Sequence, residues 1–337
     1  MSILRKSRRA IRKIIFGDTL LPHGVRLGFV EPQTEVAVWL HGMGAPLDVT
    51  HRHSMACADP LTVCIAFDKG QSPGEQNLRR LSLRFCEHNG KRRVLGEIFL
   101  RPTRSIPVGS KLFLFEARSS RNYCLPRARL WAHDLLRAYT NWRRVDASAL
   151  KMSLGGMRAM TVMFIRPHPV VLVSHASDAG GNIFPMNLMG DLGNGYFAFA
   201  LVDSREAAIG VERARRIALS SLPLPHAAVA FQLAPNHFRQ SIDWSRLAFA
   251  TRASATFRIP VPAFAQRVRE MEIAHTCKLG SHKFFIARIV SDKNFTRCEV
   301  LHLVDGIYQA WRLKDRGTEL QAPLAADSLD KRRACTS

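Results

Sequence analysis

The sequence lacks the short motifs that mark the commonest nucleotide, metal and hydrolase sites. No G-x-G-x-x-G follows a predicted strand, because Gly42-Met-Gly44 has no third glycine, and no Walker A, H-E-x-x-H or G-x-S-x-G sequence occurs. These absences remove the main support for a dinucleotide fold, a P-loop enzyme, a zincin or an α/β-hydrolase. His51 and His53 lie at alternate positions but have no third ligand nearby, so no metal site is predicted.

Cysteine pairs and long apolar runs are also missing. The seven cysteines include no C-x-x-C pair, which favours free thiols over a zinc or disulfide framework. No run of 18 apolar residues occurs, so a membrane-spanning helix is not predicted. The amino terminus is basic but has no long apolar segment with a small-residue cleavage site, and we therefore expect a cytoplasmic protein.

Acidic residues are scarce, since 27 Asp and Glu against 49 Lys and Arg give a net charge of +22. This excess favours phosphate-bearing cofactors, nucleic acid or anionic membranes as partners, or it reflects charges that only face solvent. Residues 1–24 form a basic amino-terminal segment in which cations alternate with isoleucine and leucine. That pattern suits a short amphipathic helix on lipid or on a partner, with a frayed, solvated tail as the alternative.

Short β-like runs separated by turn residues fill most of the chain. Residues 25–150 are predicted to be a β-rich domain that ends in a helix over 126–144, and residues 145–156 are interpreted as a connection. Residues 158–314 are predicted to be a second β-rich domain with one helix over 204–218, and residues 315–337 a polar tail. TVMFI (161–165), AVAFQLA (228–234) and EVLHLVDGIYQAW (299–311) are among its predicted strands. Many strands with few helices favour a mainly β fold, a β-barrel with appended helices, over a doubly wound α/β fold.

Three motifs in the second domain occur in an informative order. The stretch 168–201 gives a strand, a glycine turn, Asn182-x-x-Pro185-x-Asn187 and another strand. Asp203-Ser204-Arg205-Glu206-Ala207 then opens a helix, and Gly280-Ser281-His282 precedes an apolar strand. Taken together, residues 160–314 resemble the flavin reductase-like, FMN-binding split-barrel family. The resemblance implies an FMN-binding split barrel in the carboxy-terminal half.

A set of cofactor-binding residues is implied by the resemblance. They are Asn182, Ile183, Phe184, Met186, Asn187, Ser204 and Arg205. A Gly/Asn-rich turn and a helix start can present N–H groups to a flavin phosphate, and Arg205 can pair with it. His282 is the implied catalytic residue, contacting nicotinamide or flavin, or else a histidine that caps a barrel turn.

The implied activity is that of an NAD(P)H:flavin oxidoreductase, with FMN or FAD as the flavin. The protein would transfer hydride from NADH or NADPH to flavin, either by itself or as the reductase partner of a flavin-dependent monooxygenase. The resemblance also implies a homodimer. One alternative is a non-catalytic barrel whose basic surface binds nucleic acid or membrane; another is a flavoprotein with an organic substrate of its own. For residues 25–150, Asp59-Pro60 and the strands around it are similar to a split-barrel opening, so that domain is a degenerate split barrel or an unrelated β-rich module.

Overall fold

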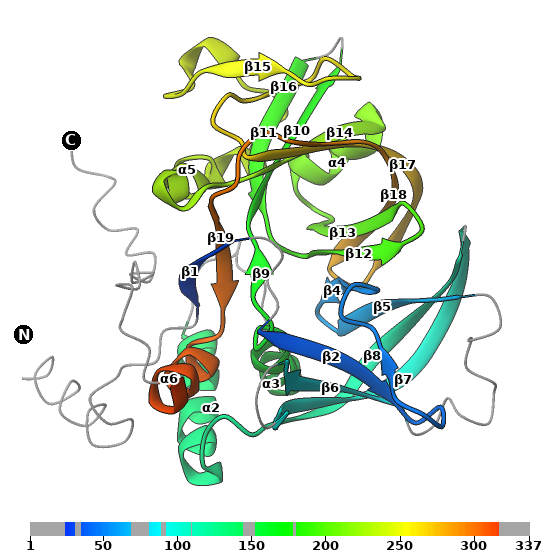
Figure 1. The fold of residues 1–337 in the computed structure, drawn as a ribbon, viewed down its shortest axis with the longest axis vertical. Helices are drawn as coiled ribbons and strands as arrows, with labels where there is room; N and C mark the ends of the chain where they lie inside the picture. Colours follow the sequence, from blue (N-terminus) through cyan, green and yellow to red (C-terminus); the bar gives the residue numbers. More distant parts are fainter. Residues whose placement is uncertain are drawn as a thin grey trace, which may run out of the picture.

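Two curved, seven-stranded antiparallel sheets dominate the computed structural model (Figure 1). The structure describes residues 24–30, 35–68, 81–88, 92–108, 110–143, 152–177 and 180–316. The mainly β fold class with appended helices is therefore confirmed. Nearly all of the predicted basic segment and polar tail lie outside the described residues.

The first sheet is built from residues 36–122 and has the strand order β3-β2-β6-β7-β8-β5-β4. Its strands are β2 (Val36–His41), β3 (Leu47–Asp48), β4 (His53–Ala58), β5 (Leu61–Phe67), β6 (Ser82–Glu87), β7 (Val94–Val108) and β8 (Ser110–Asn122). Every residue of β4 and β5 is buried. Burial on both faces means that this edge of the sheet packs on its own core and also on another layer.

The second sheet is built from residues 171–294 and has the strand order β11-β10-β14-β17-β18-β13-β12. Its strands are β10 (Val171–Ser177), β11 (Gly180–Met186), β12 (Met189–Gly193), β13 (Tyr196–Val202), β14 (Arg216–Ser221), β17 (Arg267–Leu279) and β18 (His282–Asn294). The long β17 and β18 curl over α4 (Glu206–Ala214), whose Ala207, Ala208 and Val211 close the barrel core (Figure 1).

A third small sheet joins the two ends of the described chain. It contains β1 (Val25–Val30), β19 (Glu299–Val304) and β9 (His168–Pro169), and β1 pairs with β19 rather than with a strand of the first sheet. The helices α2 (Arg127–Trp142), α3 (Leu154–Met163) and α6 (Gly306–Arg316) lie beside the first sheet (Figure 1). A lobe with α5 (Ala227–Gln232), β15 (Thr251–Ala253), β16 (Pro260–Pro262) and the short helices η2 (Leu224–His226), η3 (Ala234–Phe238) and η4 (Trp244–Arg246) covers the second sheet.

Several predicted elements have the wrong type. The segment 161–165 is predicted as a strand, but it forms the end of α3 and the two residues after it. The segment 228–234, also predicted as a strand, forms most of α5 and the two residues after it. The strand predicted over 299–311 is instead β19 followed by the start of α6. The helix predicted over 204–218 ends at Ala214, because Arg215 adopts the left-handed conformation with φ 59° and Arg216 begins β14. Short apolar runs fit a buried helix as well as a buried strand, so packing decides between them.

Membrane-spanning helices are not found in the described part of the chain, where no helix combines the necessary length with sufficient apolar character.

Candidate functional site

The residues predicted on β11 serve the interior of the second barrel. Ile183, Phe184 and Met186 are buried in its hydrophobic clusters. The amide of Asn182 is fully buried and already engaged: its Nδ2 donates to the carbonyl oxygens of Asn236 (2.9 Å) and Arg239 (2.7 Å), while its Oδ1 accepts from the N–H of Ile183 (2.8 Å). These side chains hold β11 to the covering lobe and leave no free polar group for a cofactor.

The other three predicted cofactor residues lie outside β11. Asn187 is half-buried between β11 and β12, and Ser204 is exposed before α4. Arg205 is the residue before the first turn of α4, and its guanidinium lies over the ring of Phe238 at 4.8 Å. Burial lowers the pKa of Arg205 from its ordinary value.

His282 lies where the second barrel touches the first. Its Nδ1 is 2.8 Å from the Ser281 Oγ and 3.6 Å from the Cys57 Sγ, and the Ser281 hydroxyl donates to the carbonyl of Asp59 at 3.1 Å. Burial, with a smaller effect from Arg205, lowers the pKa of His282 to about 4, so the ring is neutral at pH 7. The structure thus puts His282 at a contact between the two barrels.

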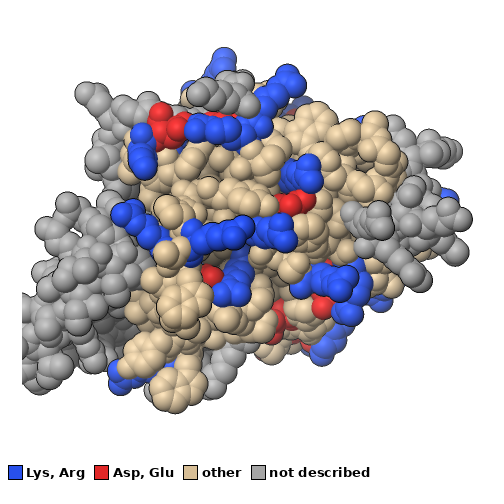
Figure 2. Space-filling view, turned by 90° about the horizontal axis from the view of Figure 1, so that it is seen from below, with Lys and Arg blue, Asp and Glu red and all other residues tan. Residues whose placement is uncertain are grey.

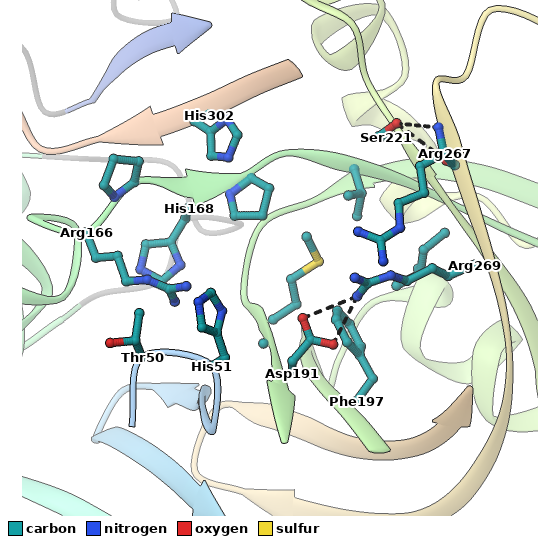
Figure 3. A pocket seen from close by; sticks show the side chains of 16 residues that line it. Thr50, His51, Arg166, His168, Asp191, Phe197, Ser221, Arg267, Arg269 and His302 are labelled. Atoms are coloured by element: carbon teal, nitrogen blue, oxygen red, sulfur yellow. Dashed lines mark hydrogen bonds and ion pairs between the residues drawn. The ribbon is translucent and has the colours of Figure 1, made fainter. Parts of the chain in front are cut away.

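A cavity of about 150 Å³ lies between the barrels, and none of the predicted site residues lines it. Its wall in the second barrel comes from β10, β12, β13, β14 and β17, and the loop before β4 closes it from the first barrel with Thr50 and His51 (Figure 3). Val171, Met189, Phe197 and Leu219 provide an apolar side. The cavity combines an apolar wall with convergent cations, as ligand pockets commonly do.

Arg166 enters the cavity from the segment that joins the two barrels (Figure 3). Its Nε is shielded from solvent and has no hydrogen-bond partner among the described residues. Burial lowers the pKa of Arg166 to about 10, and the carboxylates of Asp191 and Asp48 offset this only in part. A shielded guanidinium with an unused donor is costly unless an anion meets it.

Two further guanidinium groups face Arg166 from β17 (Figure 3). Arg267 makes a bidentate pair with Asp292, at 2.7 Å and 2.6 Å. Arg269 contacts both Asp191 oxygens, at 3.0 Å and 3.3 Å, and lies 3.3 Å from Asp292. With Arg166, three arginines line the cavity, while Asp191 and Asp292 offset part of their charge; the excess of one cation leaves a field that attracts anions.

The cavity histidines do not add charge at neutral pH. Burial, together with the nearby Arg166, lowers the pKa of His51, and it lowers that of His168 to about 3 and that of His302 to about 4. His168 is held by the Met163 carbonyl at 3.1 Å and His302 by the Val300 carbonyl at 3.0 Å. At pH 7 these rings are neutral walls, and the arginines supply the positive charge.

Gly190 lets the two barrels approach at the cavity. A Cβ on this residue of β12 would lie 2.2 Å from the carbonyl oxygen of His53 in β4. The close approach brings Thr50 and His51 over the second barrel. The described residues include no group of three or more His, Cys, Asp or Glu side chains suited to a metal ion.

Sequence reasoning missed all three cavity arginines. Arg267-Val268-Arg269 did carry a signal, because residues i and i+2 of a strand project from the same face. Arg166 carried none, since the approach of residue 166 to residues 267 and 269 depends on the folded chain.

No protein-family model and no curated protein matches the chain. Solved structures do match part of it. An FMN-binding protein from Thermus thermophilus is 19% identical to this chain. The match covers 38% of this chain and 73% of that protein, with a TM-score of 0.35. An NADH:FAD oxidoreductase from Streptomyces globisporus is 15% identical; the match covers 44% of this chain and 88% of that protein, with a TM-score of 0.39. The styrene monooxygenase flavin reductase from Pseudomonas putida S12 is 14% identical; the match covers 44% of this chain and 93% of that protein, with a TM-score of 0.36. These three structures are of an FMN-binding protein and two flavin oxidoreductases.

Proposed function

We propose that this protein is a flavin-dependent oxidoreductase that holds the phosphate end of FMN or FAD in the cavity between its barrels. The observation that carries the proposal is the convergence of Arg166, Arg267 and Arg269 on one partly open cavity. A phosphate needs several aligned N–H donors, and guanidinium groups provide them in a planar, bidentate arrangement. The sequence resemblance supplies the flavin as the bearer of that phosphate.

The size of the cavity limits what it can enclose. Pockets that bury a whole drug-sized ligand measure roughly 300–1,000 Å³, whereas this one measures about 150 Å³. The residues present therefore fit the phosphate end of a flavin nucleotide, and Met189 and Phe197 would offer an apolar surface to the rest of it. Thr50 can donate its hydroxyl proton to the phosphate, because its Oγ1 already accepts a hydrogen bond from the Val38 N–H at 2.9 Å.

The chemistry is assigned by resemblance. A bound flavin would supply hydride transfer from NADH or NADPH, a reaction that requires no general acid or base from the protein. This chain's residues would bind the phosphate, exclude water from the apolar wall and keep the ligand oriented. His282 does not line this cavity, so the proposal gives it no contact with the nicotinamide. Transfer of reduced flavin to a monooxygenase partner is part of the same proposal.

The test is a flavin titration of the purified full-length chain. We expect flavin fluorescence to change on addition of protein with a micromolar Kd, and NADH or NADPH to be oxidised when flavin is present. Arg166→Gln should weaken FMN binding more than Arg205→Gln, because Arg205 lies over Phe238 and outside the cavity. No binding of either FMN or FAD at micromolar concentrations would refute the proposal.

The basic surface is the basis of the competing function. Figure 2 shows Lys and Arg side chains gathered in bands across one face, with few acidic residues between them. If that surface binds nucleic acid, affinity for random DNA should fall steeply with salt. Flavin binding with salt-insensitive, weak DNA binding would favour the oxidoreductase.

A further inference from the structure

The two large sheets repeat one topology. Numbered from its own first strand, each sheet has the order 2-1-5-6-7-4-3. Hairpins explain some of these neighbours, but the pairings of β2 with β6 and of β5 with β8 skip strands along the chain. The second sheet repeats both of them as β10 with β14 and β13 with β18. The chain therefore contains the same seven-stranded unit twice.

The two units meet as the members of a two-fold pair would. β4 contacts β12, its own counterpart, and the contact of β4 with β13 is matched by that of β12 with β5. A contact in which each side presents the same patch is isologous, the hallmark of a two-fold interface. Here both patches belong to one chain.

The core of this contact repeats residue by residue. In the first unit Cys64 and Ala66 pair with Leu114 and Leu112 across the sheet. Ala198 and Ala200 pair with Ile286 and Phe284 at the equivalent strands. All eight side chains lie in one buried cluster, with small residues on β5 and β13 and large ones on β8 and β18.

A two-fold pair should have two equivalent cavities, but the units differ at the decisive position. In the second unit Val173, Leu219 and Arg269 are cross-strand neighbours, and the same places in the first unit hold Leu40, Leu83 and Ile98. Arg267, the other arginine of β17 in the cavity, corresponds to Gly96. A Cβ on Gly96 would lie 2.6 Å from the Ile165 Cδ1 and 2.8 Å from the Val162 Cγ1. The side chains of Val162 in α3 and of Ile165 just after it thus fill the space that Arg267 lines in the second unit.

One segment produces this asymmetry. Ile165 is fully buried in the core of the first unit, and Arg166, the next residue, lines the cavity of the second. Thr50 and His51 of the first unit also line that cavity.

We propose that this chain is an intramolecular pair of split-barrel units whose described residues form a single ligand cavity between the units. The joining segment fills the equivalent space of the first unit and supplies Arg166 to the cavity of the second. The ligand class, a phosphate-bearing nucleotide, rests on the proposed function; the one-cavity architecture does not. The pairing that a homodimer would provide is made here within one chain.

The experiment measures molar mass by light scattering and FMN stoichiometry by titration on the full-length protein. We expect the mass of one chain, 37.8 kDa, and one FMN bound per chain. Two FMN per chain would overturn the proposal.

A substitution in the contact between the two units tests the proposal without relying on FMN binding. Ala198 is buried between the units, so Ala198→Glu should lower the urea midpoint while the molar mass stays that of one chain. Ala255→Glu, at an exposed turn, is the matched control and should change neither. A two-chain mass that Ala198→Glu converts to one chain would overturn the proposal, because Ala198 would then lie between chains. If FMN does not bind at all, the proposed function fails, and the mass measurements alone decide the architecture.

Discussion

Arg166 combines a stability cost with a binding role, and the two can be separated by mutation. Arg166→Met should raise the Kd for FMN at least about tenfold, or about 1.4 kcal/mol. The same change should leave the urea midpoint unchanged or raise it, because it removes a shielded cation whose Nε has no partner. Equilibrium titration and urea unfolding measure the two effects.

The control for Arg166→Met is Arg158→Met in α3. Arg158 pairs with Asp134 and its side chain is 43% exposed, outside the cavity. Its substitution should leave the Kd for FMN as in the wild type. Unchanged FMN affinity in Arg166→Met together with a lower urea midpoint would mean that Arg166 is structural.

Asn182 is predicted to matter for stability and not for binding, since its side chain makes three hydrogen bonds within the protein, two buried and one partly buried. Asn182→Ala should lower the free energy of unfolding by about 2–4 kcal/mol, because two carbonyl oxygens and one N–H lose their partner. Urea unfolding checks this. If the variant is as stable as the wild type but binds FMN more weakly, Asn182 is a cofactor-binding residue and the structural role given to it here is wrong.

At the scale of elements, the approach of β12 to β4 depends on Gly190. Gly190→Ala should destabilise the fold by more than about 3 kcal/mol, because a Cβ there meets the His53 carbonyl at 2.2 Å and backbone must move. Gly155→Ala in α3 is the matched control: its Cβ would meet nothing within 4 Å, and alanine favours the helix by up to about 1 kcal/mol. Unfolding midpoints of the two variants should move in opposite directions.

At the scale of the whole molecule, buried neutral histidines make stability depend on pH. Burial is the largest cause that lowers the pKa of His53 and His168 to about 3 and of His302 to about 4, against about 6.5 in the unfolded chain. The unfolded state therefore binds more protons below pH 6.5, and stability is lost as pH falls from there toward the folded pKa values. At pH 5 each of these histidines should cost about 2 kcal/mol relative to pH 7.

Urea unfolding at pH 7 and pH 5 measures this loss. His226→Gln, at an exposed position, should keep the same difference between the two pH values. Equal stability at both pH values would show that the buried rings accept protons without unfolding.

The sequence by itself determined what depends on short-range pattern. Alternating apolar residues predict most strands, and the turn Gly193-Asn194-Gly195 predicts a hairpin, where all three residues adopt positive φ of 74°, 52° and 75°. The ordered motifs of residues 160–314 were sufficient to name a family resemblance and a mainly β fold. These features are local, so each stretch carries its own evidence.

Only the tertiary structure decided which residues share a site. Asn182 and Phe184 belong to the predicted motif, yet their side chains are used inside the barrel. Arg166 and Arg269 are about a hundred residues apart in the chain and line one cavity because residues 166–169 pass beside the second sheet. The secondary structure of segment 161–165 depends on packing in the same way. This apolar run lies in and just after helix α3, where its side chains pack into the first barrel. Long-range packing has no counterpart in local sequence pattern, and it alone selects which barrel keeps an open cavity.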